Sequence, residues 1–207
     1  LIDPDVIEES NRSRVVGATA DDVSAGRRKV DIADALIKQA SPDAITLLIA
    51  DDLAKESVAR QLIGVDYLFL AADSMRARLV FNALVHQYQI PGVQLGAKIR
   101  ATDTGELLSV MSVNRPVRPG QGCLWCSGFI DPTALAQESV SDEERAAQAY
   151  GTAQPNPSVI GLNALASALA VNDFMLSYLG MRSEADCVRY EHFSLLDRRR
   201  SLVEPRN

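Results

Sequence analysis

The first part of the chain holds acidic and basic side chains of the kind that bind phosphate groups. Asp3 and Asp5 lie just after a short apolar stretch, and Arg14 and Lys29 follow them. A carboxylate at a strand end can hold ribose hydroxyls or a metal ion. Arginine clamps a phosphate through two hydrogen bonds, and lysine adds a mobile positive charge. Either acid alone is also typical of a solvated turn, but the combination points to phosphoryl or nucleotidyl chemistry, which depends on positioning and charge neutralisation.

Lys29 stands at the expected start of a helix, next to Arg27 and Arg28. A cation at a helix N-terminus opposes the helix dipole and is unfavourable by itself. We therefore interpret this basic start as a weak sign that an anionic ligand binds nearby.

A third carboxylate, Asp73, comes directly after the apolar run of residues 66–72. At the carboxyl end of a strand it can hold Mg²⁺ against substrate phosphates. Asp is also a strong N-cap, so the same residue can start the helix that follows. The two roles are compatible, and the sequence favours neither.

Two cysteines, Cys123 and Cys126, form a C-x-x-C motif in a loop rich in glycine and proline. The spacing suits half of a tetrahedral zinc site. A thioredoxin-type motif is less consistent, because no strand precedes the pair and no helix starts at it. An empty dithiol and a site completed outside this chain are the alternatives; Cys187 with His192 is a poor completion.

The composition is that of an ordinary globular domain. The chain has 207 residues, of which 47% are apolar and 23% charged, with a net charge of −6. An acidic chain without a basic stripe is a poor candidate for binding nucleic acid. The odd count of three cysteines and the lack of a signal peptide favour a reducing, cytoplasmic location.

Alternating apolar runs predict the elements that position these side chains. Buried strands are expected at 44–49, 66–72 and 93–99, separated by helices at 51–63 and 75–88. A further helix is expected from Lys29 to Ser41. This alternation implies right-handed crossovers and a parallel sheet.

The pattern changes after Lys98. Residues 99–113 predict a hairpin that turns at Asp103-Thr104-Gly105. We expect mostly loop over 114–158, with one helix near 141–150 that starts in a capping box, and one or two edge strands within 188–203.

The longest apolar stretch, Val159 to Leu179, has the length of a membrane span. Asn163, Asn172 and Asp173 interrupt it, and small residues dominate part of it. We therefore interpret it as a buried or dimer-interface helix.

Several motifs in order resemble those of ThiF/MoeB/HesA proteins, the ubiquitin-activating-enzyme-like adenylyltransferases. The stretch from Asp3 to Arg14 is similar to their D-x-D-x-[VI]-x-x-S-N-[LX]-x-R sequence. Further matches follow along nearly the whole chain: Gly26–Val30, Asp73–Arg78 with Asn82, Ile90-Pro91 leading to Gly96, the C-x-x-C motif, and Pro157–Gly161.

The resemblance implies an α/β, Rossmann-like fold with a mostly parallel sheet flanked by helices and a C-terminal antiparallel extension. Residues 1–207 would form a single adenylyltransferase domain, incomplete at both ends. Residues 114–158 would hold the zinc motif and a crossover loop. The family's glycine-rich loop would precede Leu1, and its second zinc C-x-x-C would follow Asn207.

The resemblance also implies a reaction: ATP-dependent adenylation of the C-terminal glycine of a ubiquitin-like or sulfur-carrier protein, with release of pyrophosphate. By this resemblance, Asp3 would bind the ribose and Asp5 would lie near the phosphates. Asp73 would hold Mg²⁺, and zinc would bind Cys123 and Cys126. Asn11, Arg14 and Lys29 would contact the triphosphate. Arg14, Lys29 and Asp73 would be the catalytic residues, with Arg14 and Lys29 neutralising the charge of the transition state.

Members of this family form dimers, so a homodimer is expected, in which Arg14 or Arg12 reaches the partner's nucleotide. No cysteine lies in 127–158 to form a thioester, and Cys187 is a poor substitute. This favours adenylation without thioester transfer, or transfer through a cysteine elsewhere. A bacterial, cytoplasmic protein without membrane association is expected.

Three other functions remain open at this point. The first is a catalytically incomplete structural subunit of a heterodimeric activating enzyme, which the near-complete polar set disfavours. The second is an adenylase of tRNA or of a small molecule; the acidic charge disfavours tRNA. An NAD-dependent dehydrogenase is least consistent, because Lys29 and Asp73 would then have no role.

Overall fold

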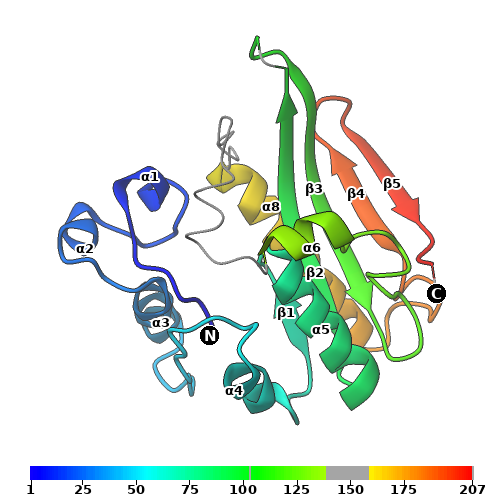
Figure 1. Ribbon diagram of the computed structural model, residues 1–207, viewed down its shortest axis with the longest axis horizontal. Helices are drawn as coiled ribbons and strands as arrows, with labels where there is room; N and C mark the ends of the chain where they lie inside the picture. The colour runs from blue at the N-terminus through cyan, green and yellow to red at the C-terminus, as the bar shows by residue number, and fades with distance from the viewer. Residues whose placement is uncertain (103, 139–158, 207) are drawn as a thin grey trace. The chain divides into compact units, whose positions relative to one another are not determined.

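The computed structural model describes residues 1–102, 104–138 and 159–206. The chain divides into two compact units, residues 1–62 and residues 63–207, and each is described by itself (Figure 1).

The first unit consists of short helices joined by loops, with isolated bridges in place of strands. Ile2 pairs with Ile49 in parallel, and Val6 pairs with Arg28 antiparallel. The helices are α1 (Glu9–Arg12), α2 (Ala20–Ser24), α3 (Lys29–Ala40), α4 (Glu56–Ala59) and the 3₁₀ helix η1 (Arg60–Leu62).

Helix α3 confirms the prediction of a helix from Lys29 to the Ser41 boundary. Its buried residues are Val30 and Ile32. They lie two positions apart at the start of the helix, so the packed surface covers mainly its first turn. The predicted helix at 51–63 is present in shorter form, as α4 and η1.

The predicted strand at 44–49 is wrong for most of its length. Only Ile49 joins a bridge, while Ile45 is fully exposed and Leu47 is 63% exposed. A strand requires backbone partners on a neighbouring strand as well as apolar side chains. An apolar run alone therefore does not settle the assignment.

The second unit is built on a five-stranded sheet with the strand order β1-β2-β3-β4-β5. Strands β1 and β2 are parallel, and the other pairs are antiparallel (Figure 1). This confirms the α/β fold class, with a smaller parallel part and a larger antiparallel extension than expected. The strands are β1 (Leu68–Leu70), β2 (Gly92–Ala101), β3 (Leu107–Val117), β4 (Tyr190–Ser194) and β5 (Arg199–Val203).

The crossover from β1 to β2 runs through α5 (Met75–Tyr88), as predicted. The helix ends at Gln89, whose φ of 60° is left-handed. Gly92 then starts β2 at a position where neighbouring atoms leave no room for a side chain. A Cβ there would lie 2.6 Å from the Leu68 carbonyl oxygen and 2.7 Å from the Phe81 ring, so only glycine fits.

The hairpin of β2 and β3 is longer than predicted. Its pairing extends from Ala101 opposite Leu107 to Gly92 opposite Val117, so the loop expected from residue 114 begins later. Gly105 has a φ of 88° in the turn; Asp103 lies outside the described residues, as does the predicted helix at 141–150.

Helix α6 (Pro132–Glu138) falls within the region that was expected to be loop. The Asp131 side chain accepts hydrogen bonds from the backbone N–H groups of Thr133 (2.8 Å) and Ala134 (3.1 Å). Such an acceptor satisfies the free donors of a helix start. A short helix can therefore begin in a proline-rich segment.

Helix α8 (Ile160–Tyr178) packs against β2 and β3. Its small residues Ala166 and Ala170 meet Val93 and Leu95 in a buried cluster. The helix is long and apolar enough to cross a membrane by length and composition alone. Its opposite side carries exposed apolar residues: Ile160, Val171, Met175 and Tyr178.

Candidate functional site

The structure brings together three charged residues of the first unit that the sequence singled out. The Lys29 ammonium Nζ lies 2.6 Å from Oδ2 of Asp5. The backbone N–H of Asp5 donates to Oδ1 of Asp3 at 2.9 Å. Two carboxylates and one ammonium thus share a small region at the start of α3.

Backbone pairing fixes this arrangement. The N–H of Lys29 donates to the Asp5 carbonyl at 3.0 Å, and the N–H of Ile7 donates to the Arg27 carbonyl at 2.8 Å. The segment 5–7 therefore runs antiparallel beside 27–29. The Asp5 carboxylate also compensates the unfavourable cation at the helix N-terminus, so this contact alone explains how Lys29 is tolerated there.

Asp3 has a perturbed carboxyl group. Burial raises the pKa of Asp3, and the N–H of Asp5 and the charge of Lys29 oppose this effect. A half-buried carboxylate with free oxygen lone pairs can accept hydrogen bonds from two neighbouring hydroxyls, as a ribose presents.

The polar residues in and next to helix α1 make hydrogen bonds and an ion pair with residues three or four positions away. Asn11 is buried, and its Oδ1 accepts from the Glu8 backbone N–H at 3.0 Å; this leaves its Nδ2 amide to reach a ligand. The Arg14 guanidinium donates to the Ser10 carbonyl at 3.0 Å. Arg12 is paired with Glu9 at 2.7 Å, so it is less available than Arg14.

In the second unit, Asp73 is exposed in the turn between β1 and α5. The alternative role as N-cap is wrong: Ser74 is the cap, and its Oγ accepts from the Ala77 N–H at 3.1 Å. Capping therefore does not occupy the Asp73 carboxylate, which fits the oxygen-only donor chemistry that Mg²⁺ requires.

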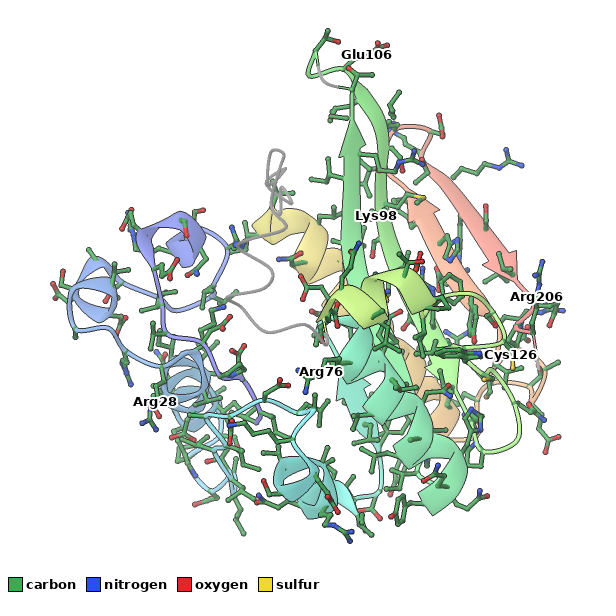
Figure 2. The ribbon with its side chains drawn as sticks, viewed as in Figure 1. Arg28, Arg76, Lys98, Glu106, Cys126 and Arg206 are labelled. Atoms are coloured by element: carbon green, nitrogen blue, oxygen red, sulfur yellow. The ribbon has the colours of Figure 1, made fainter. Side chains whose placement is uncertain are left out.

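A carboxylate that the sequence did not single out lies at the same helix start. The two Glu138 oxygens accept from the backbone N–H groups of Met75 (2.8 Å) and Arg76 (2.9 Å). Figure 2 labels Arg76 at this end of α5. Both Asp73 and Glu138 act electrostatically on Arg78. No sequence signal could have found Glu138, because it lies far along the chain from this turn.

Two hydrogen-bond donors point at the Cys123 sulfur in the Cys123–Cys126 loop. The N–H of Cys126 donates to Sγ of Cys123 at 3.4 Å, and Nδ2 of Asn82 approaches the same sulfur at 3.7 Å. Burial raises the pKa of Cys123, but hydrogen bonds from Cys126, Asn82 and Trp125 outweigh it, so the net pKa is lowered. Donors aimed at a sulfur favour the thiolate form that ligates metals.

The described residues do not complete a zinc site. Among residues 1–102, 104–138 and 159–206, no group of three or more His, Cys, Asp or Glu side chains could hold a metal ion. Cys187 is buried and its Sγ lies 3.5 Å from Ser177 Oγ, so it does not join the pair with His192. Two thiols fit half of a tetrahedral site and no more.

The C-terminal segment returns to this loop. The Arg206 N–H donates to Ser127 Oγ at 3.0 Å. Figure 2 shows Cys126 and Arg206 at the same edge of the second unit.

The chain belongs to the ThiF family, because the family model matches residues 1–205. This confirms the resemblance of the ordered motifs. No curated protein sequence matches the chain.

Solved structures share the fold at low sequence identity. E. coli MccB with ATP is 19% identical, with a TM-score of 0.72 over 100% of this chain and 56% of MccB. MccB in complex with N-formylated MccA is 18% identical, with a TM-score of 0.70 over 100% of this chain and 57% of MccB. PaaA is 19% identical, with a TM-score of 0.65 over 99% and 63%. The chain thus spans a little over half the length of MccB.

Proposed function

We propose that this protein adenylates a carboxylate with ATP. The observation that carries this proposal is the cluster of Lys29, Asp5 and Asp3 in a ThiF-family chain. It supplies hydrogen-bond acceptors for a ribose and a cation for phosphates at one helix start. MccB, which shares the fold, has been solved with ATP and with the ATP analogue AMPCPP.

In this proposal Lys29 and Arg14 neutralise charge on the triphosphate as the leaving pyrophosphate develops. Asp3 accepts hydrogen bonds from ribose hydroxyls, Asp5 orients Lys29, and Asn11 offers its Nδ2 amide. Asp73 is the residue that would hold Mg²⁺. When bound, this ion would screen the phosphate charges.

The substrate we propose is the C-terminal carboxylate of a ubiquitin-like or sulfur-carrier protein, or of a peptide. MccB has been solved with MccA, which supports a polypeptide substrate. Cys123 and Cys126 would contribute two thiolates to a structural zinc site completed by ligands from elsewhere. We place the reaction in the cytoplasm, where thiols stay reduced.

A second copy of the chain is the proposed partner for α8. The apolar face formed by Ile160, Val171, Met175 and Tyr178 is exposed. Exposed apolar stripes of this kind mark protein contacts. The molar mass in solution, from light scattering, tests this; the charge substitution Val171→Lys should shift a dimer toward the monomer.

ATP–pyrophosphate exchange tests the proposed activity. Exchange should require a carboxylate substrate, so it is measured alone, with MccA and with a ubiquitin-like protein ending in glycine. Asp73→Asn should reduce it strongly. The matched control is Asp66→Asn, because Asp66 is also exposed but precedes β1 instead of following it. Lack of exchange with a protein that binds ATP would indicate a structural subunit instead.

Nucleotide affinity should also depend on pH through Asp3. Because its pKa is raised by burial, Asp3 becomes protonated at a higher pH than an ordinary aspartate does. Protonation removes acceptor capacity, so ATP affinity should fall as the solution is acidified, and Asp3→Asn should abolish that part of the pH dependence.

A further inference from the structure

A buried positive charge, that of Arg115, lacks a negative partner among the described residues. Arg115 lies on β3, is 9% exposed, and pairs with Gln94 on the neighbouring strand β2. Its Nη1 donates to the neutral Oε1 of Gln94, and its guanidinium carbon lies 3.9 Å from the centre of the Phe129 ring. A guanidinium that is buried without a carboxylate is unfavourable for folding.

A second guanidinium adds to this unbalanced charge. Burial and then the charge of Arg78 lower the pKa of Arg115 to about 10, and Tyr190 opposes them. Arg115 is therefore still protonated at neutral pH. Arg78, on α5, donates from Nη1 to the Phe129 carbonyl at 3.0 Å, so it too is bonded to a neutral acceptor.

Negative charge reaches these two arginines on the side of Arg78 only. Asp73 and Glu138 act on Arg78, although burial still lowers its pKa, and neither of them acts on Arg115. The start of α5, next to these carboxylates, also carries the Arg76 guanidinium and the positive end of the helix dipole. With all these described charges counted, the surroundings of Arg115 remain positive.

Three buried nitrogen atoms in this region have no hydrogen-bond partner among the described residues: Nε of Arg78, Nε of Arg115 and Nε2 of His192. His192 lies opposite Val113, which is two residues from Arg115 on β3, so His192 and Arg115 point to the same face of the sheet. Burial and then the charge of Arg115 lower the pKa of His192. Buried polar atoms are nearly always hydrogen-bonded. Because guanidinium nitrogens can only donate, the missing partner is an acceptor.

The part of the Arg115 guanidinium that is left over has a definite shape. Gln94 takes one end of it, and Phe129 covers one of its faces. The remaining edge carries Nε and Nη2, of which Nη2 makes no described hydrogen bond and is not fully buried. Nε would become accessible with a shift of the half-buried Phe129 ring. Two parallel donors of this kind match the two oxygens of a carboxylate.

We propose that Arg115, together with Arg78, binds a carboxylate of the polypeptide substrate. The inference rests on the proposed function only for the kind of substrate. The carboxylate is the C-terminal group or the side chain of an acidic residue near it, because both present the same planar pair of oxygens. A basic residue at that place in the substrate would be repelled.

NMR of the Arg115 Nε–H group tests the proposal without nucleotide. The isotope-labelled chain is titrated at constant ionic strength with acetyl-Gly-Gly, which has only a terminal carboxylate, and with acetyl-Glu-Gly-amide, which has only a side-chain carboxylate. Neutral acetyl-Gln-Gly-amide and inorganic pyrophosphate are the comparisons. The Arg115 signal should shift and saturate with at least one carboxylate peptide and stay in place with the neutral one. The peptide that binds more tightly identifies the source of the carboxylate.

Arg115→Lys keeps the positive charge but loses the planar edge. Its affinity for the carboxylate peptide, followed through the Arg78 Nε–H signal, should fall on the order of tenfold, because a charge-assisted hydrogen bond is lost. The control is Arg100→Lys, which replaces an exposed arginine on β2 and should leave the affinity unchanged. Urea unfolding checks that both variants fold. The titration of the wild type decides the proposal even without a folded variant.

The proposal is overturned if neither carboxylate peptide moves the Arg115 signal, if the neutral peptide moves it equally, or if only pyrophosphate does. It is also overturned if folded Arg115→Lys binds the carboxylate peptide as tightly as the wild type. Failure of the proposed adenylation would look different. The carboxylate peptide would then bind as expected, yet no polypeptide would support ATP–pyrophosphate exchange.

Discussion

The two units of the chain hold their candidate functional side chains by different means. In residues 1–62, short helices and isolated bridges place Asp3, Asp5 and Lys29 through backbone hydrogen bonds between nearby loops. In residues 63–207, a five-stranded sheet with α5 and α8 places Asp73 and the cysteine loop through packed elements.

Because of this difference, we expect substitutions in the two units to affect the proposed activity and the stability of the fold to different extents. The first unit contributes few fully buried apolar side chains, among them Ile7, Val30 and Val58. We therefore expect that its exposed and partly exposed charged residues can be replaced at little cost in folding energy, with the buried Asp22 as an exception. In the second unit, the elements that carry the site are also the core, so a core substitution should disturb both properties.

The largest expected effect is on the core of the second unit. Phe81→Ala should lower the free energy of unfolding by about 3–5 kcal/mol, because Phe81 is only 2% exposed and packs beside Gly92. Urea unfolding followed by circular dichroism measures this. Tyr88→Ala, on the same helix but 46% exposed, should change stability by less than about 0.5 kcal/mol. Equal losses would remove the proposed contrast between core and surface.

For Lys29 in the first unit we expect a large loss of activity and only a small loss of stability. Lys29→Ala should reduce ATP–pyrophosphate exchange by about 100- to 1,000-fold, as loss of a charge-stabilising donor does elsewhere. Its partly exposed pair with Asp5 should contribute only about 0–1 kcal/mol to stability. Lys55→Ala, which breaks the exposed pair with Asp51, is the control for charge. A Lys29 variant that unfolds would contradict the separation of the two properties.

A smaller effect is expected at the start of α2. Thr19 Oγ1 accepts the Asp22 N–H at 3.2 Å, and Asp22 Oδ2 accepts the Thr19 N–H at 2.8 Å in return. Thr19→Ala should cost about 1 kcal/mol, as loss of an N-cap does. Thr19→Ser keeps the oxygen and should restore the stability. Both are measured by thermal unfolding.

The smallest effect is a pH dependence in the same capping box. Hydrogen bonds from Thr19 and then Arg27 lower the pKa of Asp22 from 3.8 to about 2. The folded chain thus binds fewer protons than the unfolded chain in this range, so this stabilisation is complete above pH about 4 and is lost as pH falls toward 2.

Urea titrations at several acidic pH values test the capping-box effect. Asp22→Asn should flatten the dependence of the unfolding free energy on pH between about 2 and 4. Asp21→Asn removes a neighbouring carboxylate outside the capping box and serves as the control. An unchanged dependence of stability on pH in Asp22→Asn would show that the Asp22 carboxylate does not stabilise the fold through this capping box.

Much of the fold was predictable where a pattern is local. The helical spacing after Asp73 predicted α5 over its full length, and the pattern from Lys29 predicted α3. Strands near β4 and β5 were also expected, but only β5 is the edge strand that was predicted, because β4 pairs with both β3 and β5. These predictions succeed because helix periodicity and turn residues act over a few neighbouring positions. The run at 44–49 failed because strand formation needs a partner from elsewhere.

The sequence by itself determined the family, and its ordered motifs pointed to the residues of the candidate site: Asp3, Lys29, Asp73 and the cysteine pair. Only the tertiary structure decided how Lys29 meets Asp5, how Asn82 meets Cys123, and that Glu138 caps α5. These contacts join residues far apart in the chain. Their geometry depends on how whole elements pack, and packing is not encoded in local spacing.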